Sequence, residues 1–311
     1  MDQAQFYYSN GKLLITAEYL VLKGAQALAV PTQFGQSLAV YPNDKETLKW
    51  QAYEHDRLWL NLDLSMDEIL SPKSGTIPEK AFIAELLNQA IALNPRFCDA
   101  LHHRVETHLD FNRNWGLGSS STLINNVAKW AQVDAFDLLA RVSQGSGYDI
   151  ACAQNNTPIL FQKTGNKPRI QSCLFSPDFK DQIYFLYLGK KQKSEKEVQR
   201  FLAQEKDCKQ EIQAVSDLSL QLLESHTASD FDKIVTEHER ITSGLLGLPC
   251  LKQKAFADFQ GSVKSLGAWG GDFAMLRSDW DRKTIQNYFE SKSLNTLIPW
   301  DNMVIEADFD L

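Results

Sequence analysis

The sequence predicts an α+β protein of two domains. Its 311 residues suit about two domains of ordinary size. The first part alternates short strand-like and helix-like segments, and the second part is expected to run strand, helices, strand, helix, strand, which is typical of an α+β domain. The composition turns polar around residues 176–181, so we expect domains at 1–178 and 179–311.

The first domain is expected to contain short strands separated by turn residues, and helices with apolar side chains at helical spacing. The strands are expected at residues 12–16, 37–41, 48–53, 57–62, 104–109 and 159–162. The helices are expected at residues 78–93, 123–130 and 136–142.

The second domain begins with a strongly apolar segment and continues into long helices. Ser229 is a candidate N-cap for one of these helices, because its hydroxyl can accept a backbone N–H. The strands are expected at residues 183–188, 273–276 and 303–307. The helices are expected at residues 195–224, with a break near 216–217, at 229–243 and at 283–289.

Charge and composition exclude several classes of function. The net charge of −7 gives no bulk positive field, so we expect no nucleic-acid partner. No segment is long and apolar enough to span a membrane, and the polar N-terminus is not a signal peptide, so we expect a cytoplasmic protein. The five cysteines form no C-x-x-C pair, which argues against a zinc site or a redox dithiol.

The most informative segment is Asn114-Trp115-Gly116-Leu117-Gly118-Ser119-Ser120-Ser121-Thr122, directly before an apolar helix. Its glycines allow close approach of the backbone to a ligand, and the helix start offers N–H groups and a positive dipole end. It is neither a Walker A loop nor a dinucleotide fingerprint, because the required lysine and third glycine are missing. The segment predicts a polyphosphate site; the alternative is an ordinary turn with a capping serine.

Three further segments carry candidate chemistry. Lys12 starts a buried strand and could neutralise charge on a transferred phosphoryl group, or could be a solvated strand-edge lysine. Asp149 follows a tight glycine turn and could take a proton from an alcohol, or could stabilise a helix N-terminus. Residues 264–272 hold three glycines, which indicates close passage of the backbone past a bulky polar group, or a plain connecting loop.

In their order and spacing these segments resemble the GHMP kinases, which include galactokinase, homoserine kinase, mevalonate kinase and phosphomevalonate kinase. Residues 11–32, 112–122 and 264–272 resemble the three family motifs, and residues 146–149 resemble the segment with the catalytic aspartate. Within the family the motifs are most similar to those of phosphomevalonate kinases, and Gly-Tyr-Asp-Ile-Ala is also typical of a bacterial subgroup. The resemblance implies an N-terminal α/β domain like domain 2 of ribosomal protein S5 and a ferredoxin-like C-terminal domain.

The resemblance also implies ATP and Mg²⁺ as cofactors, a small-molecule phosphate acceptor, and catalytic roles for Asp149 and Lys12. Glu18, Ser146, Gly147 and Lys264 would contact the acceptor, and Ser120 and Asp137 would bind the metal. The nucleotide would be held by Asn114, Trp115, Gly116, Leu117, Gly118, Ser119, Ser120, Ser121, Gly267, Ala268, Gly270 and Gly271.

Several choices stay open from the sequence. Phosphomevalonate is the favoured acceptor; mevalonate, another small alcohol or a sugar is the alternative, as are a diphosphomevalonate-decarboxylase-like enzyme and a non-catalytic nucleotide sensor. A phosphorylated acceptor would require extra cations, with Lys190, Lys191, Lys193, Arg240 and Lys264 as candidates. The protein could be a monomer or a homodimer.

Three positions depart from the family pattern. Asn112 stands where proline is usual, and Trp269 where a small residue is usual. Asp137 lies one position out of register with the magnesium-binding glutamate of mevalonate kinases, and Asp134 is a further candidate. Either aspartate could equally be a helix cap.

Overall fold

The computed structural model describes residues 4–43, 47–72, 77–165, 167–189, 201–203, 207–267, 269 and 271–306. The chain forms two compact units. Unit 1 holds residues 1–11, 34–113 and 117–154, and unit 2 holds residues 12–33, 114–116 and 155–311. The strands β1 (Gln5–Leu14) and β2 (Ala27–Pro42) each contribute residues to both units. The domain division at residue 178 stays a prediction.

In unit 1 the strands are held by regular antiparallel and parallel pairing. β3 (Leu48–Glu54) pairs antiparallel with β4 (Arg57–Leu64) and parallel with β5 (His103–Leu109), and β5 pairs with residues 36–42 of β2. Alternate residues of β3 are buried, as expected for a strand with one face on a core. The structure therefore contains the strands expected in unit 1, although β1 starts earlier and β2 is far longer than expected.

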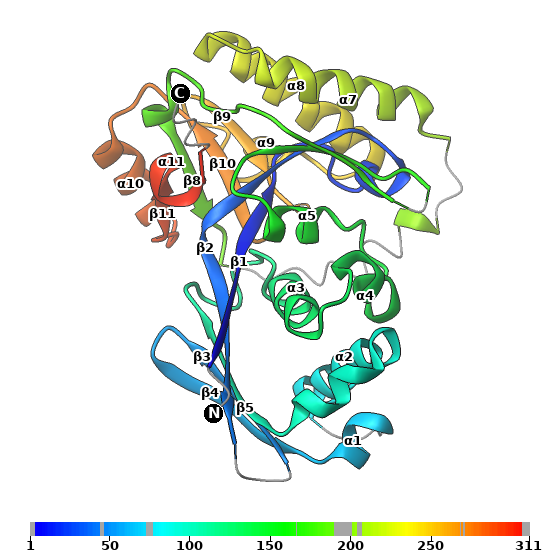
Figure 1. Cartoon of the computed structure of the whole chain (residues 1–311). Coiled ribbons are helices and arrows are strands. Elements are labelled where there is room, and N and C mark those ends of the chain that lie inside the picture. The colour runs from blue at the N-terminus through cyan, green and yellow to red at the C-terminus, as the bar shows by residue number, and fades with distance from the viewer. Residues whose placement is uncertain are drawn as a thin grey trace, which may run out of the picture. The chain divides into compact units, whose positions relative to one another are not determined.

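The helices of unit 1 lie on one side of β3, β4 and β5 (Figure 1). Their apolar faces and the inner face of the strands form one hydrophobic core that includes Trp50, Leu87 and Trp130. The helices are α1 (Met66–Leu70), α2 (Pro78–Leu93), α3 (Ser119–Ala131), α4 (Ala135–Val142) and α5 (Tyr148–Gln154), with a 3₁₀ helix, η2, at Pro95–Leu101.

Unit 2 contains the first part of β2 and two strands that continue from it. Residues 27–29 of β2 pair with β6 (Ile159–Gln162), and β6 pairs with β7 (Arg169–Ser172). The sequence predicted β6 at its observed bounds but missed β7. Its four residues are exposed or half-buried and polar apart from one isoleucine, so they give no apolar signal.

The rest of unit 2 is built on a four-stranded antiparallel sheet in the order β11-β8-β10-β9. These strands are β8 (Ile183–Tyr187), β9 (Ser262–Ser265), β10 (Phe273–Arg277) and β11 (Leu297–Pro299). Helices separate β8 from β9 and β10 from β11, while β9 and β10 follow each other directly. This β-α-β-β-α-β connectivity is ferredoxin-like and confirms the expectation for the C-terminal part.

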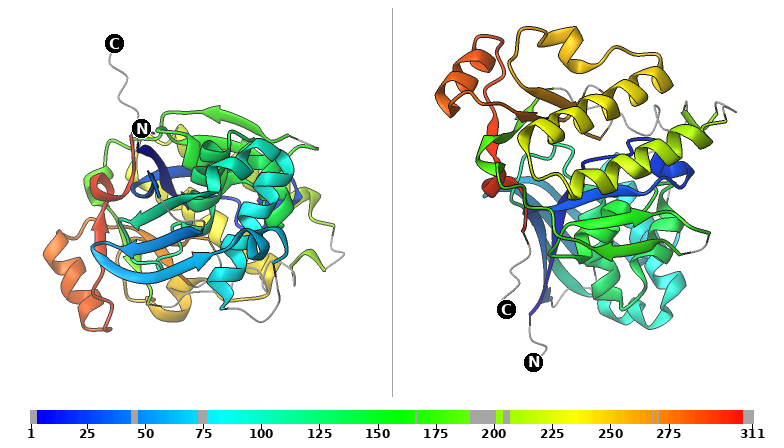
Figure 2. Two further views of the ribbon diagram at one scale, coloured as in Figure 1. Left: turned by 60° about the horizontal axis from the view of Figure 1, so that its bottom comes forward. Right: turned by 90° about the horizontal axis from the view of Figure 1, so that it is seen from above.

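Helices α7 and α8 run side by side in Figures 1 and 2. Apolar side chains of α9, α10 and the sheet form a second core that includes Phe256, Phe259 and Phe289. The helices of unit 2 are α7 (Lys209–Leu223), α8 (Ala228–Leu246), α9 (Leu251–Ala255), α10 (Arg282–Glu290) and α11 (Trp300–Met303), with 3₁₀ helices η1 (Leu20–Lys23) and η3 (Lys180–Gln182).

Three sequence-based expectations for unit 2 were wrong. Helix α8 starts after Thr227, whose hydroxyl accepts the amide of Asp230 at 3.1 Å, and not after Ser229. Helix α7 is unbroken at 216–217, and the Ser216 hydroxyl donates to the Ile212 carbonyl one turn earlier. The strand expected at 303–307 is absent from its described residues: Met303 ends a helix that begins at Trp300, and Val304 makes only an isolated bridge to Thr32.

The start of the predicted helix at 195–224 lies outside the described residues. Among the residues that the structure describes, no helix is long and apolar enough to cross a membrane.

Candidate active site

In unit 1 the serine-rich segment forms the first turn of α3. Gly118 is the N-cap, with a left-handed φ of 92°, and glycine has no side chain that could cap the helix. Ser120 is exposed, whereas Ser119 and Ser121 are half-buried. Uncapped N–H groups and hydroxyls at a helix start are suited to an anion, and the phosphate site here stays a prediction.

Thr122 does not share this position. It is 1% exposed, and its hydroxyl donates to Gln36 Oε1 at 2.7 Å. The fourth hydroxyl of the run therefore holds α3 against β2, and three remain for a ligand.

Buried amides that the sequence analysis missed also fix α3. Asn126 Nδ2 donates to the Gln36 carbonyl at 2.9 Å, and Asn125 Nδ2 donates to Ser9 Oγ at 2.8 Å. Ser9 Oγ donates to Asn126 Oδ1 at 2.6 Å, which closes the network. Two consecutive asparagines within an apolar helix were the available signal, because buried amides must find partners.

Asp149 lies in the first turn of α5 and is half-buried. Gly147 precedes it with a φ of 94°, and a Cβ built there would lie 3.2 Å from the ring of Phe136. Helix α5 packs on α3, because Asn125 donates to the Ala153 carbonyl and accepts from Gln154. The structure thus brings Asp149 and Ser119–Ser121 onto two neighbouring helices of one unit. Ser146 lies beside them, with its hydroxyl 3.5 Å from the Tyr148 amide.

The two candidate metal ligands on α4 have different surroundings. Asp134 is the N-cap, and its carboxylate accepts the amides of Phe136 and Asp137 at 2.8 and 3.1 Å. Asp137 is exposed in the first turn of the same helix. Within the described residues no cluster of three or more His, Cys, Asp or Glu side chains is arranged for a metal ion. Mg²⁺ is usually held by one or two protein ligands, substrate phosphates and water, so a site of this kind needs no such cluster.

In unit 2 Lys12 and the glycine segment meet directly. Lys12 is half-buried, and its Nζ donates to the Gly116 carbonyl at 3.1 Å. Gly116 has a φ of 68°, and a Cβ built there would overlap the Asp272 carboxylate. Residues from three distant parts of the sequence therefore meet at Gly116.

The residues around Gly116 are anchored by aromatic side chains. The indole of Trp115 lies edge-on to the Phe273 ring, with ring centres 5.7 Å apart. Tyr187 donates its hydroxyl to the Asn114 carbonyl at 3.2 Å. Burial and the negative charge of Asp272 raise the pKa of Tyr187, so this hydroxyl stays protonated and able to donate. Leu117 is fully buried in unit 1.

The third glycine-rich segment is the connection between β9 and β10. Gly267 has a φ of 69°, Gly271 is buried, and Asp272 has a left-handed φ of 52°. Trp269 is 7% exposed, with its indole N–H 3.4 Å from the Pro249 carbonyl. The large side chain therefore packs into the protein. Ala268 and Gly270 lie outside the described residues.

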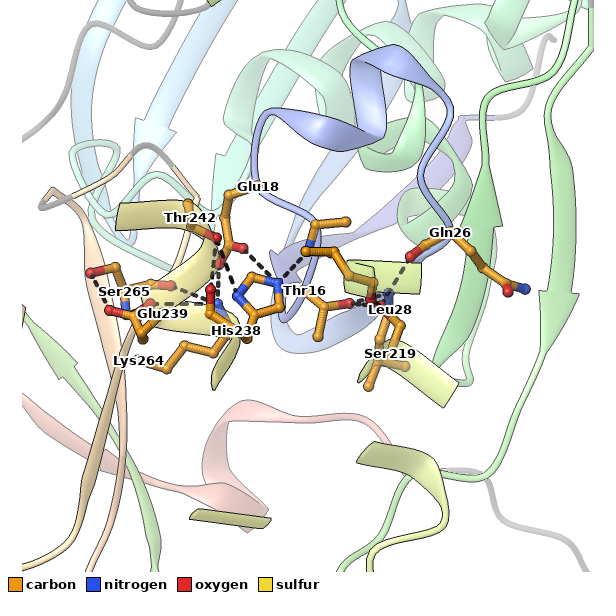
Figure 3. A network of polar contacts seen from close by, with 12 residues as sticks. Thr16, Glu18, Gln26, Leu28, Ser219, His238, Glu239, Thr242, Lys264 and Ser265 are labelled. Carbon is orange, nitrogen blue, oxygen red and sulfur yellow. Dashed lines mark hydrogen bonds and ion pairs between the residues drawn. The ribbon is translucent and has the colours of Figure 1, made fainter. Parts of the chain in front are cut away.

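Glu18 and Lys264, both predicted to contact the acceptor, form a buried ion pair (Figure 3). Each is only 1% exposed. His238 and Glu239 of α8 surround this pair, and the sequence analysis missed both. The available signal was the apolar stripe of α8, because His238 falls on its three-and-four spacing between Val235 and Thr242.

The candidate cations for a phosphorylated acceptor are mostly accounted for elsewhere. Arg240 is an exposed residue that pairs with Glu237 through two hydrogen bonds. Lys264 is buried in the pair with Glu18. Lys190, Lys191 and Lys193 lie outside the described residues.

Solved structures share this architecture over almost the whole chain. A mevalonate kinase superposes with a TM-score of 0.71 at 15% identity, covering 97% of this chain and all of the other. The Streptococcus pneumoniae phosphomevalonate kinase in complex with phosphomevalonate and AMPPNP gives 0.71 at 19% identity, covering 95% and 99%. The Lactococcus lactis galactokinase complexed with galactose gives 0.66 at 11% identity, covering 98% and 94%.

The chain has the GHMP kinase fold. No family model and no curated protein sequence matches it. The identities are too low to carry an activity or a substrate from one protein to the other, so the GHMP kinase fold is what the likeness shows.

Proposed function

We propose that the protein is an ATP-dependent phosphotransferase that acts on a small molecule. The observation that carries the proposal is the meeting of Lys12, the Gly116 carbonyl and Asp272 in unit 2. A lysine held beside a glycine turn that leads into the uncapped start of α3 suits a polyphosphate. The GHMP kinase fold supports the same reaction, since the S. pneumoniae protein of that fold binds AMPPNP, an ATP analogue.

The chain's own groups have separable roles in this proposal. The N–H groups and serine hydroxyls in the first turn of α3 bind phosphate oxygens, and Gly267 and Gly271 add no side chain at their own positions in the β9–β10 connection. Lys12 is a point charge that balances charge on the transferred group. Mg²⁺ would be held by the phosphates together with Ser120 and Asp137, and would neutralise part of their charge.

Asp149 is proposed to accept the proton of an alcohol acceptor. As the acceptor oxygen bonds to the γ-phosphorus, the bond to the ADP oxygen breaks, and the alcohol proton passes to the carboxylate. A phosphomonoester acceptor has a second pKa near 6 and is mostly ionised at neutral pH, so it depends less on a base. The fall in kcat when Asp149 is replaced should therefore be large for an alcohol acceptor and small for a phosphomonoester.

Phosphomevalonate is our first choice of acceptor. The sequence motifs are most similar to those of phosphomevalonate kinases, and the S. pneumoniae enzyme shares the fold. Against it, Lys264 and Arg240 already have carboxylate partners. Mevalonate or another small alcohol is therefore the second choice, because it would need fewer cations.

The test is ADP release from ATP across phosphomevalonate, mevalonate, galactose and amino-acid alcohols, with released carbon dioxide measured on diphosphomevalonate. We expect turnover with one acceptor and no carbon dioxide. Tight ATP binding without turnover on any of them would instead favour a nucleotide sensor. Carbon dioxide release would favour a decarboxylase.

Asp149→Asn tests the proposed base. With an alcohol acceptor we expect kcat to fall by roughly 10²–10⁴-fold, because general-base assistance contributes about that much. AMPPNP affinity, measured by calorimetry, should stay within about threefold of wild type, because the side chain keeps its shape and loses only the charge and the proton-accepting oxygen that the reaction would use. Undiminished turnover would remove Asp149 from the chemistry.

A further inference from the structure

Two neighbouring residues of α8 hold two separate backbone segments of unit 2. His238 Nε2 accepts the Ala17 amide at 2.9 Å, and Glu239 Oε1 accepts the Ser265 amide at 3.1 Å. Both side chains are nearly fully buried, at 1% and 3% exposed. Figure 3 shows them in one cluster with Glu18 and Lys264, the chain neighbours of Ala17 and Ser265.

The charges of this cluster are balanced if one of its two carboxyl groups keeps its proton. Lys264 pairs closely with Glu18 and lies 3.8 Å from Glu239, so one ammonium faces two carboxyl groups. Burial raises the pKa of Glu239 to about 8. The charge of Glu18 adds to this rise, and the charge of Lys264 works against it. Burial also raises the pKa of Glu18, which Lys264 opposes. Burial therefore favours a protonated carboxyl in this cluster at neutral pH, beside the ammonium of Lys264.

His238 is uncharged as well. Its Nε2 accepts the Ala17 amide and so carries no proton, while its Nδ1 lies 3.4 Å from the Thr242 hydroxyl. Burial and the nearby Lys264 lower the pKa of His238 well below its ordinary value. A neutral imidazole and a protonated carboxyl can both accept a backbone N–H without adding charge to the interior.

The segment held by His238 has an unusual backbone. Ala17 and Tyr19 have φ values of 66° and 61°, in the left-handed region that residues other than glycine rarely adopt. Such a conformation persists only where the surroundings fix it. The hydrogen bond from Ala17 to His238 is one contact that fixes it, and the Glu18–Lys264 pair is another.

Both held segments lead to the residues that meet at Gly116. The chain reaches Ala17 directly from β1, which carries Lys12. Ser265 ends β9, and the connection that follows it carries Asp272. The cluster thus holds the two segments that carry Lys12 and Asp272, and both of these residues contact Gly116.

We infer that Glu239, together with His238, is a positioning residue that sets the separation of Lys12 and Asp272 by fixing the backbone at Ala17 and Ser265. The inference rests on the proposed function only for its effect on turnover; the backbone effect is independent of it. Neither residue touches the reacting atoms. Both act through the two segments they hold.

The test compares Glu239→Gln, Glu239→Ala and Glu239→Asp, with Glu237→Ala as the control. Glutamine keeps the accepting oxygen without a titratable group, alanine removes the acceptor, and aspartate keeps the carboxyl but shortens its reach. Glu237 lies on the same helix but is only half-buried, and its carboxylate pairs with Arg240.

Amide hydrogen exchange at Ala17 and Ser265 reports on the backbone directly and needs no phosphate-acceptor substrate. We expect about tenfold faster exchange or more at Ser265 in the alanine and aspartate variants, and wild-type protection in the glutamine and control variants. With the acceptor that gives turnover, alanine should lower kcat by about 10–100-fold, since small misplacements of catalytic groups cost that much. KM for ATP should change by less than about threefold.

Unchanged exchange at Ser265 together with wild-type kcat in the alanine and aspartate variants would overturn the inference. The inference would also be overturned if the glutamine variant were as impaired as the alanine variant. An uncharged side chain that accepts the Ser265 N–H would then not be enough to hold the backbone. If the alanine variant fails to fold, the aspartate variant gives the same comparison. Failure of every acceptor would count against the proposed function, while the exchange result would still decide the inference.

Discussion

At the scale of single residues, Lys12 shows most clearly how one side chain can serve both fold and chemistry. Its ammonium bonds the Gly116 carbonyl, which holds the glycine segment in place in unit 2. A half-buried ammonium also keeps enough exposure to meet an anion. The two roles predict different losses when the lysine is replaced.

Lys12→Met distinguishes the structural role of the lysine from its proposed role in catalysis. We expect kcat to fall by roughly 10²–10³-fold, the usual loss when a group that stabilises transition-state charge is removed. AMPPNP affinity should fall far less, because the backbone N–H groups of α3 would still hold the phosphates. Steady-state kinetics and calorimetry check the split.

Lys23→Met is the control for Lys12→Met, since Lys23 is another half-buried lysine of unit 2, 3.6 Å from Cys208 Sγ. It should leave kcat within about twofold of wild type. If Lys12→Met lowered only the thermal midpoint and left kcat intact, Lys12 would be structural.

At the scale of elements, Gly116 is needed for two reasons: its backbone is left-handed, and no side chain would fit beside Asp272. Gly116 and Gly247 have nearly the same φ, 68° and 66°. A Cβ at Gly116 would overlap the Asp272 carboxylate, whereas a Cβ at Gly247, the C-cap of α8, would meet nothing within 4 Å. Comparing alanine substitutions at Gly116 and Gly247 therefore separates the free energy lost through a left-handed backbone from the free energy lost through crowding.

Gly247→Ala should cost about 1–2 kcal/mol of unfolding free energy, the penalty of a left-handed conformation for a residue with a Cβ. Gly116→Ala should cost more than that and should also weaken AMPPNP binding, because Asp272 must move. Urea denaturation and calorimetry measure the two effects. Equal destabilisation with unchanged nucleotide affinity would show that Gly116 is needed for its φ alone.

At the scale of the whole molecule, the buried cluster links stability to pH. Glu239 keeps its proton up to a pKa of about 8 in the folded protein, whereas its ordinary value is 4.5. Between these values the folded state binds the proton and the unfolded state does not, so rising pH favours unfolding. Lys264, Glu18, His238 and Cys250 are the titratable groups that face Glu239.

We expect the unfolding free energy of wild type to fall, relative to Glu239→Gln, by up to about 1.4 kcal/mol per pH unit between pH 6.5 and 8. The low pKa of His238 has the opposite sign, but its effect ends near its ordinary value of 6.5. Urea denaturation at several pH values measures the difference. Parallel curves for the two proteins would show that Glu239 does not hold a proton in this range.

The elements that the sequence predicted correctly are those with a clear apolar period. Helix α2 was expected at its observed bounds, because its apolar residues recur at helical spacing and a proline opens its first turn. Strand β7 and helix α11 were missed or misassigned, because their form depends on pairing and burial that local composition does not encode.

The candidate site divides in the same way. The glycines, serines and Asp149 of the proposed site were predicted from the sequence, because phosphate binding and proton transfer require particular residue types at close spacing. Glu239, His238 and the buried amides of α3 could not, because their roles arise from contacts with residues far away in the sequence.

By itself the sequence determined the α+β fold class and the segments expected to bind phosphate, since periodicity and motif spacing are local properties. The ferredoxin-like C-terminal part was expected only from the resemblance to the GHMP kinases. Only the tertiary structure decided which charges are buried against one another. It paired Glu18 with Lys264, turned Thr122 inward and brought Lys12 to Gly116. Burial sets the cost of a charge, and burial exists only once distant segments have packed together.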